Sequence, residues 1–294
     1  MTEPDHRGHA TGEGTSGSGN LRLRVASAAV LAPVVVAITI VGGWIFFAVC
    51  TVAAGGILWE WTSLAAGRAD ARILTPGWVA LLLAGAFIGL GLPYASFGMI
   101  AIGAALAGLV VVALPPDEAA PSAAVWAAAG VVYAGAGLLG PALLRSDPEW
   151  GLTALLFLFA TVWITDIFAY FCGHVIGGSR LWPTLSPNKT WSGAVGGLIG
   201  GVAAGITVAY ASGVAKLGMI GVMAVLLSIL AQAGDLLESA VKRRFGAKDT
   251  GWLIPGHGGL MDRLDGFLVA AFAALIIGML RQGTGSPARG LLVW

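Results

Sequence analysis

Long apolar segments dominate this chain and restrict what it can fold into. A helix needs about 20 residues to cross roughly 30 Å of hydrocarbon, and the segments have about that length. Hydrophobic residues make up 57% of the chain and charged residues only 11%, whereas about 25% are charged in soluble globular proteins. We therefore predict an all-α, polytopic integral membrane protein with about nine transmembrane helices. The predicted spans are residues 24–42, 44–65, 77–94, 97–114, 122–144, 151–173, 191–211, 217–240 and 266–281. Only Gly42 and Gly43 separate the first two spans. A topology in which these two segments form one span, or in which one of them is re-entrant, therefore stays open.

The chain divides into three regions of different character. Residues 1–20 are rich in Gly, Ser, Thr and His without apolar periodicity, which predicts a disordered cytosolic tail. Residues 21–150 are bland and rich in small residues, as in close helix packing within lipid, and are interpreted as a transmembrane scaffold. Residues 151–285 hold the polar chemistry and form the predicted catalytic region, with cytosolic loops at 174–190 and 241–265.

The basic residues set the predicted orientation. With a cytosolic N-terminus, the inside segments carry all of the 16 Lys and Arg residues except Arg145, Lys216, Arg281 and Arg289. Cytoplasmic loops usually carry the excess of positive charge. The N-terminus is therefore predicted inside and the C-terminus outside, which places both polar loops on the side where nucleoside triphosphates are found.

Net charge and cysteine content exclude other classes of function. A formal net charge of +1 gives no basic surface for nucleic-acid binding. The two cysteines, Cys50 and Cys172, lie in apolar runs and are too few for a disulfide framework or a zinc site.

A polar stripe is predicted on the eighth span. Asp235, Glu238, Ser239 and Lys242 are spaced i, i+3, i+4 and i+7, which puts them on one side of a helix. Ionisable groups within a span usually face one another, an ion or a substrate. The stripe predicts a polar cavity, although an ion pair that serves packing alone would give the same pattern.

The loop after this span adds further charge and a glycine-rich turn. Glycines beside a histidine let backbone N–H groups approach an anion such as phosphate. Carboxylates beside a phosphate require a divalent cation between them, and Mg²⁺ is usually bound by one or two carboxylates together with substrate phosphates. The residues concerned are Arg243, Lys248, Asp249, Pro255, Gly256, His257, Gly258, Gly259, Asp262, Arg263 and Asp265.

A second constellation occupies the other polar loop. Asp166 lies in the sixth span, and Ser186 and Lys189-Thr190 lead into the seventh. Thr190 or Ser186 is predicted to cap that helix, and the free N–H groups with Lys189 would then form an anion site. A plain cap with a lysine reaching the interface is the alternative. Glu60, the one acidic residue in the first five spans, lies near a span end and is interpreted as interfacial.

These residues resemble, position for position, the signature of the phosphatidate cytidylyltransferase (CDP-diacylglycerol synthase) family. The resemblance is sharp over about residues 166–266 and only general before them. The matching residues are Ser239, Val241, Lys242-Arg243, Lys248-Asp249, Gly251, Ile254-Pro255, His257-Gly258-Gly259-Leu260, Asp262-Arg263 and Asp265, with Gly234-Asp235-Leu236, Ser186-Pro187 and Lys189-Thr190 resembling two further family motifs.

The resemblance implies transfer of a cytidylyl group from CTP to phosphatidic acid, with Mg²⁺ alone or with a second cation. It implies a bacterial inner-membrane enzyme, no nucleic-acid partner, and a homodimer. Asp235 and Asp262 are the implied metal ligands. Catalytic roles are implied for Asp235, Lys242, Arg243, Lys248, His257, Asp262, Arg263 and Asp265, and substrate contacts for Asp166, Ser186, Lys189, Thr190, Glu238, Ser239, Asp249, Gly258 and Gly259.

Two residues depart from the family pattern. Ser192 stands where the family commonly has Glu, so an acid function at that place is not expected here. His174 stands where a basic residue, often Arg, is more typical, and histidine carries only partial charge at neutral pH.

Two other functions stay open from the sequence. A CTP-dependent polyprenol kinase could use a comparable polar loop, although it would release CDP instead of pyrophosphate. An ion-coupled transporter could use Asp166, Asp235 and Glu238, although transporters usually show repeated halves and broken helices, and no such repeat is visible.

Overall fold

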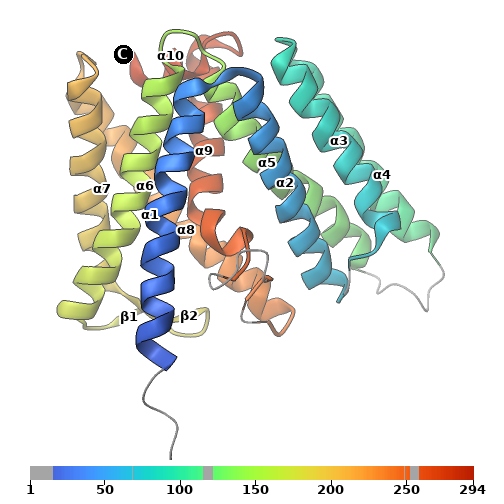
Figure 1. Ribbon diagram of the computed structural model, residues 1–294, viewed down its shortest axis with the longest axis horizontal. Coiled ribbons are helices and arrows are strands. Elements are labelled where there is room, and N and C mark those ends of the chain that lie inside the picture. The colour runs from blue at the N-terminus through green and yellow to red at the C-terminus, as the bar shows by residue number, and fades with distance from the viewer. Residues whose placement is uncertain (1–15, 68, 115–121, 248, 252–257) are drawn as a thin grey trace, which may run out of the picture.

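The computed structural model describes residues 16–67, 69–114, 122–247, 249–251 and 258–294, with side chains from residue 29 onward. These residues form a bundle of helices that run up and down between two ends, with one β-hairpin (Figure 1). The elements are α1 (Ser16–Val41), α2 (Gly43–Ala66), α3 (Ala71–Gly89), α4 (Pro93–Ala113), α5 (Ala123–Arg145), α6 (Gly151–Val175), β1 (Arg180–Trp182), β2 (Ser186–Thr190), α7 (Trp191–Ala211), α8 (Leu217–Arg244), α9 (Met261–Gln282) and α10 (Pro287–Leu292).

The predicted all-α polytopic membrane protein is confirmed. Within the described residues, eight helices, α2 to α9, are long and apolar enough to cross a membrane. The first predicted span falls on α1, whose shorter apolar part is Ala29–Val41. The count of nine spans therefore stays a prediction.

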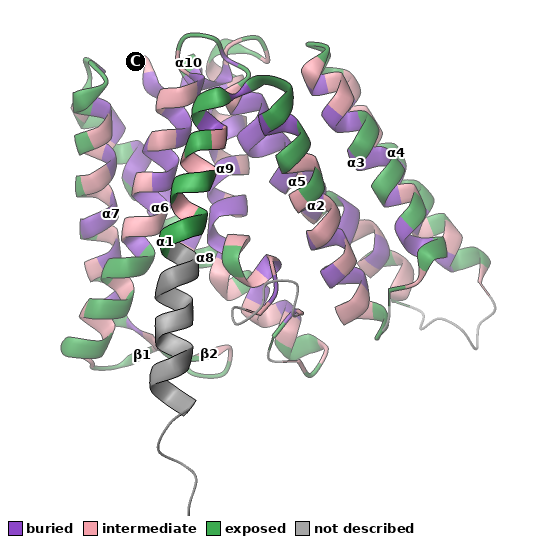
Figure 2. Ribbon diagram, viewed as in Figure 1, coloured by how far each residue is buried: buried purple, intermediate pink, exposed green. Residues whose placement is uncertain are grey.

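The outer surface of the bundle is apolar. Large hydrophobic side chains are exposed on the outer faces of the helices, for example Val52 on α2, Val112 on α4 and Leu280 on α9. Figure 2 shows exposed and intermediate residues along the outward faces of α1, α3, α4 and α7. Such a surface suits lipid, because lipid tails are as apolar as these side chains.

Both predicted polar loops lie at the same end of the bundle. The β1–β2 hairpin and the C-terminal end of α8 are at the end where α1 begins, and α10 and the C-terminus are at the other end (Figure 1). β1 and β2 pair antiparallel. The folding of the chain thus collects the polar segments on one side.

The turn from α1 to α2 is closed by an arginine from α5. Gly42 has a φ of 65°, a left-handed conformation that glycine adopts without strain. Arg145 donates from Nε to the Thr39 carbonyl oxygen at 2.6 Å and from Nη2 to the Ile40 carbonyl oxygen at 3.1 Å. The last carbonyl groups of a helix accept no hydrogen bond from the helix itself. Arg145 supplies the missing donors and so fixes the end of α1.

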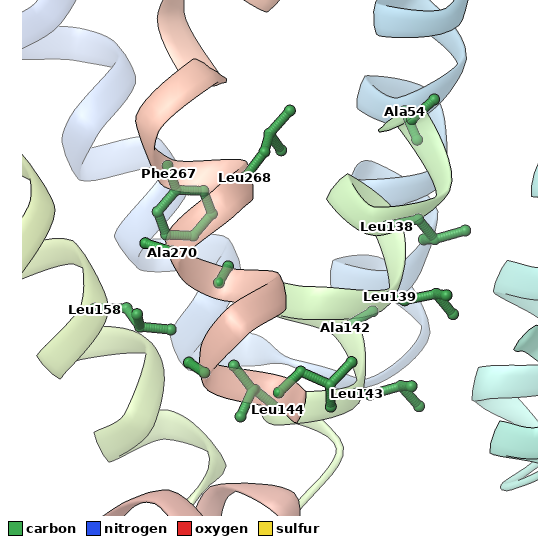
Figure 3. Packing of buried hydrophobic residues seen from close by; sticks show 14 of the residues in the cluster. Ala54, Leu138, Leu139, Ala142, Leu143, Leu144, Leu158, Phe267, Leu268 and Ala270 are labelled. Atoms are coloured by element: carbon green, nitrogen blue, oxygen red, sulfur yellow. The ribbon is translucent and has the colours of Figure 1, made fainter. Parts of the chain in front are cut away.

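The core centres on α9, which packs against α5, α6 and α8. Leu138 and Leu144 of α5, Leu158 of α6 and Leu268 of α9 are buried there (Figure 3). A Cβ atom on Gly140 would lie only 2.8 Å from the backbone nitrogen of Phe272. The absence of a side chain at Gly140 therefore lets α5 and α9 approach closely.

Glycines also bring α6 and α7 together. A Cβ atom on Gly197 would lie 2.7 Å from the Thr165 carbonyl oxygen, and one on Gly201 would lie 2.7 Å from the Thr161 carbonyl oxygen. The Thr165 hydroxyl is also hydrogen-bonded to the Ser228 hydroxyl at 2.9 Å, which joins α6 to α8. This interface supports the end of α6 that reaches the polar region.

The helices on either side extend into the predicted loop 241–265. α8 continues to Arg244 and α9 already begins at Met261. Apolar length marks only the part of a helix that lies in hydrocarbon, whereas backbone hydrogen bonding continues into the polar residues. Residues 16–20 of the predicted tail belong to α1, and residues 1–15 lie outside the described residues. The predicted loop 174–190 contains the hairpin.

A side chain at Gly201 should separate α6 from α7. Gly201→Val would place methyl groups against the α6 backbone, and overpacking of this kind costs about 1–3 kcal/mol. We expect a lower thermal unfolding midpoint in detergent. Gly98→Val in α4 is the matched control, because a Cβ atom there meets nothing within 4 Å. Equal midpoints for the two variants would contradict the packing argument.

Candidate active site

Two glycines bring the acidic residues of α8 and α9 together. A Cβ atom on Gly266 would lie 2.9 Å from both the Ala231 carbonyl oxygen and Asp235 Oδ1, and one on Gly234 would lie 2.7 Å from the Asp265 carbonyl oxygen. The two backbones therefore cross closely at the level of Asp235 and Asp265. This crossing places the polar stripe of α8 against the first turns of α9.

Lys242 joins two of the carboxylates. Its Nζ lies 2.7 Å from Asp262 Oδ1 and 3.4 Å from Glu238 Oε1. The Glu238 side chain is only 1% exposed, and its Oε1 is buried without a hydrogen bond from the described residues. One ammonium group is thus shared by two acids, and its contact with Glu238 Oε1 is longer than a hydrogen bond.

Asp262 also holds the loop that precedes α9. Its Oδ2 accepts hydrogen bonds from Thr250 N at 3.1 Å, Thr250 Oγ1 at 2.9 Å and Gly259 N at 3.0 Å. A Cβ atom on Gly259 would clash with the Thr250 hydroxyl. Gly259 lets the backbone of this turn approach closely, as expected. Its N–H group, however, donates to Asp262 and not to a free anion site.

Glu60 reaches this region from α2. It is fully buried, and its Oε1 accepts from Leu260 N at 2.8 Å while its Oε2 accepts from Met261 N at 2.7 Å. Its side chain therefore faces the interior of the protein, and its place near the membrane interface stays a prediction. An acidic residue within an apolar span usually has a partner inside the protein, and this signal could have indicated the contacts of Glu60.

A cavity of about 650 Å³ lies beside the cluster, between α6, the hairpin, the start of α7 and α8. This volume is in the usual range for small-molecule sites. Lys189 Nζ lies 2.8 Å from Asp235 Oδ2, which links the cavity to the polar stripe. The cavity brings together all four residues predicted on α6 and the hairpin, Asp166, Ser186, Lys189 and Thr190, with Asp235 of α8.

The entrance to α7 is capped as predicted. The Thr190 side chain accepts a hydrogen bond from Gly193 N at 3.1 Å and forms the N-cap of α7. Ser192 Oγ donates to the Gly177 carbonyl oxygen. Ser192, which stands where an acid is common in the family that the sequence resembles, therefore joins the loop after α6 to α7.

The contacts given above do not involve the other predicted residues. Arg243 is exposed and donates from Nη1 to the Ala247 carbonyl oxygen at 3.2 Å, beyond the end of α8. Asp249 and Arg263 are exposed, and Ser239 and Gly258 are half-buried. Lys248 and His257 lie outside the described residues.

Sequence reasoning missed several residues at the site. Arg180 and Gln232 line the cavity, and Gln232 Nε2 donates to the Ala194 carbonyl oxygen at 3.3 Å. Tyr133 of α5 stacks on Trp61, and its hydroxyl is buried without a hydrogen bond from the described residues. A single tyrosine or glutamine in an apolar span gives no distinguishing pattern.

The carboxylates fit Mg²⁺ by chemistry, although they are not arranged around an ion. Their hard oxygens suit Mg²⁺, which is usually bound by one or two carboxylates and substrate phosphates. Among the described residues, no group of three or more acidic, histidine or cysteine side chains could hold a metal ion. Asp235 and Asp262 each pair with a lysine instead. This donor set fits an ion that arrives with a nucleotide.

Comparisons with known proteins agree with the motif-based resemblance. A family model described as "Cytidylyltransferase family" matches residues 22–280. Proteins named phosphatidate cytidylyltransferase from Brucella abortus biovar 1 (strain 9-941) and Brucella suis biovar 1 (strain 1330) are each 44% identical over 262 residues, 88% of this chain and 93% of theirs. One of the same name from Staphylococcus haemolyticus (strain JCSC1435) is 42% identical over 139 residues, 47% of this chain and 52% of its own.

The two lysines should contribute differently to stability. Lys242→Met would leave Glu238 and Asp262 buried without a cation, and loss of one partner of a buried pair costs about 3 kcal/mol or more. Lys189→Met should cost less, about 1 kcal/mol, because the Lys189 and Asp235 side chains are 30% and 22% exposed. Thermal unfolding midpoints in detergent would compare them, with Arg243→Gln as an exposed control. A midpoint for Lys242→Met at or above that of Lys189→Met would refute this ranking.

Proposed function

The chain belongs to the cytidylyltransferase family, and we propose that it transfers a cytidylyl group from CTP to phosphatidic acid for phospholipid biosynthesis. The products are CDP-diacylglycerol and pyrophosphate. The Brucella proteins named phosphatidate cytidylyltransferase match this chain along most of their length. The observation that carries the proposal is the cavity in which Lys189 pairs with Asp235, next to the pair of Lys242 with Asp262.

The reaction needs no side-chain nucleophile. A phosphate oxygen of phosphatidic acid attacks the α-phosphorus of CTP, and a new P–O bond forms. The bond from the α-phosphorus to the oxygen that bridges to the β-phosphorus breaks, and pyrophosphate leaves with that electron pair. The protein has to align the two phosphates and neutralise their charge, which are the main contributions in such transfers.

Lysines can supply much of that neutralisation. Lys189 Nζ and Lys242 Nζ each contact a carboxylate oxygen at hydrogen-bonding distance. Each ammonium group has three N–H donors, so both can also contact phosphate oxygens. Arg180, Ser186 and Asn188 of the hairpin line the cavity together with Lys189 and offer further donors.

Mg²⁺ is the proposed cofactor, alone or with a second cation. When bound, it would supply positive charge to the CTP phosphates. Asp235 and Asp262 are its proposed ligands, and Asp265 and Glu238 support them. Glu238 Oε1, which is buried and accepts no hydrogen bond from the described residues, and the close approach of Asp235 to the backbone of α9 support this donor set.

The surroundings of the cavity suit a lipid substrate. Tyr170 and His174 of α6 line it, and the same helix exposes Ile167, Phe171 and Val175. A lipid can therefore place its phosphate in the cavity while its acyl chains stay in contact with apolar surface.

We place the enzyme in a bacterial inner membrane with the hairpin and the α8–α9 connection in the cytosol. The excess of basic residues at this end and the need for CTP support this orientation. A homodimer is proposed from the family resemblance alone. The comparisons give no support to a polyprenol kinase or a transporter.

Loss of either proposed metal ligand should stop transfer. With CTP labelled in cytosine, Mg²⁺ and phosphatidic acid, the wild type should place label in extracted lipid. Asp235→Asn and Asp262→Asn should reduce the rate by at least about 100-fold. Glu149→Gln, an exposed acid paired with Arg289 at the other end, is the control. Release of labelled CDP without labelled lipid would instead indicate a kinase.

The orientation can be tested with introduced cysteines. Thr184 in the hairpin and Gln282 at the end of α9 are both exposed. In intact cells, a membrane-impermeant maleimide should label Gln282→Cys, and it should label Thr184→Cys only after permeabilisation. The wild type, with half-buried Cys50 and Cys172, gives the background. The reverse pattern would contradict the proposed topology.

A further inference from the structure

Glu60 belongs to the half of the chain interpreted as scaffold, and it does not line the cavity. Its carboxylate is nevertheless fully buried against residues that surround Asp262. Burial of a carboxylate without charge compensation is costly. The groups that donate hydrogen bonds to the Glu60 carboxylate therefore indicate its role in the structure.

The start of α9 has no cap of its own. The first N–H groups of a helix have no partner within the helix, and the N-cap residue Leu260 provides no side-chain hydrogen bond. Each Glu60 oxygen accepts one of these N–H groups, from Leu260 and from Met261. A negative charge is also favourable at this positive end of the helix dipole. Glu60 is thus the cap of α9, supplied from α2.

Glu60 also contacts both segments that hold Asp262. Thr250 Oγ1 lies 3.4 Å from Glu60 Oε2 and 2.9 Å from Asp262 Oδ2, so this hydroxyl stands between the two acids. A Cβ atom on Gly251 would lie 3.0 Å from Glu60 Oε1, and one on Gly259 would lie 2.8 Å from Glu60 Oε2. The loop therefore folds directly around the Glu60 carboxylate.

We propose that Glu60 is a positioning residue for cytidylyl transfer, which holds the first turn of α9 and its Asp262 in the geometry that the reaction requires. The inference rests on the proposed function. Glu60 acts through the Leu260 and Met261 amides and through Thr250, and it touches no substrate. Asp262 lies one residue beyond Met261, so a shift of this turn moves its carboxylate relative to Lys242.

Asp147 provides a matched control for a purely structural cap. It is 2% exposed, and it accepts hydrogen bonds from Glu149 N at 3.1 Å, Trp150 N at 2.9 Å and Arg289 N at 3.1 Å. It therefore joins α6 to α10 much as Glu60 joins α2 to α9. Asp147 lies at the opposite end of the bundle from the polar loops, near α10.

The test compares Glu60→Gln, Glu60→Asp and Asp147→Asn with the wild type. The steady-state parameters kcat and KM for CTP and phosphatidic acid are measured on folded protein well below each unfolding midpoint. In Glu60→Gln an amide –NH₂ faces an N–H donor, so we expect kcat to fall about 10–100-fold. KM for phosphatidic acid should stay within about threefold. Glu60→Asp keeps the charge but is one methylene shorter, so its kcat should be intermediate. Asp147→Asn should lower the midpoint and leave kcat near the wild-type value.

A second readout does not depend on activity. Backbone hydrogen exchange at residues 259–266 should be faster in Glu60→Gln than in the wild type, and unchanged in Asp147→Asn. A kcat for Glu60→Gln within twofold of the wild type would overturn the inference. If Glu60→Gln does not fold, a wild-type kcat in Glu60→Asp would overturn it equally. A wild type that transfers no cytidylyl group would reject the proposed function itself, and the inference with it.

Discussion

The structure depends on one constraint: ionised groups near the membrane interior need partners from the protein, because hydrocarbon offers none. Every acid of the α8–α9 crossing whose contacts are described above meets a lysine, a backbone N–H or a hydroxyl. These partners come from β2, α8, the loop before α9 and the first residue of α9. Glycines at 234, 259 and 266 let the backbones approach closely enough for those contacts to form. The site is therefore a product of tight packing as much as of its charges.

The N-terminal half of the chain also contributes to the candidate site. The N-terminal helices contribute Glu60 to the loop before α9, and Tyr133 stacks on Trp61 close to the same region. α5 packs on α9 through Gly140. The first half thus determines where the start of α9 lies.

The sequence predicted most of the membrane architecture, because apolar length is a direct measure of what can cross a bilayer. It also placed Asp235, Glu238 and Lys242 together, since helical spacing puts such residues on one face, and it identified the Thr190 cap. It did not show that α9 begins at Met261, because charged residues hide a helix from a hydropathy criterion. It could not reveal the partners of Glu60, which lie 200 and 201 residues away. The direction of Arg243, toward a carbonyl of its own loop, depends on local geometry that spacing does not encode.

The lysine–carboxylate pairs have a consequence for how substrate is bound. Without ligand, the protein supplies its own counterions: Lys189 neutralises Asp235, and Lys242 neutralises Asp262. Nucleotide and cation would enter a site in which Asp235 and Asp262 are already paired, so their binding would exchange ion partners at these two carboxylates. The affinity then reflects a difference between two paired states, which is much smaller than the attraction of bare charges. Such an exchange favours arrival of the anion and the cation together, and it lets pyrophosphate leave without exposing unpaired acids to the membrane.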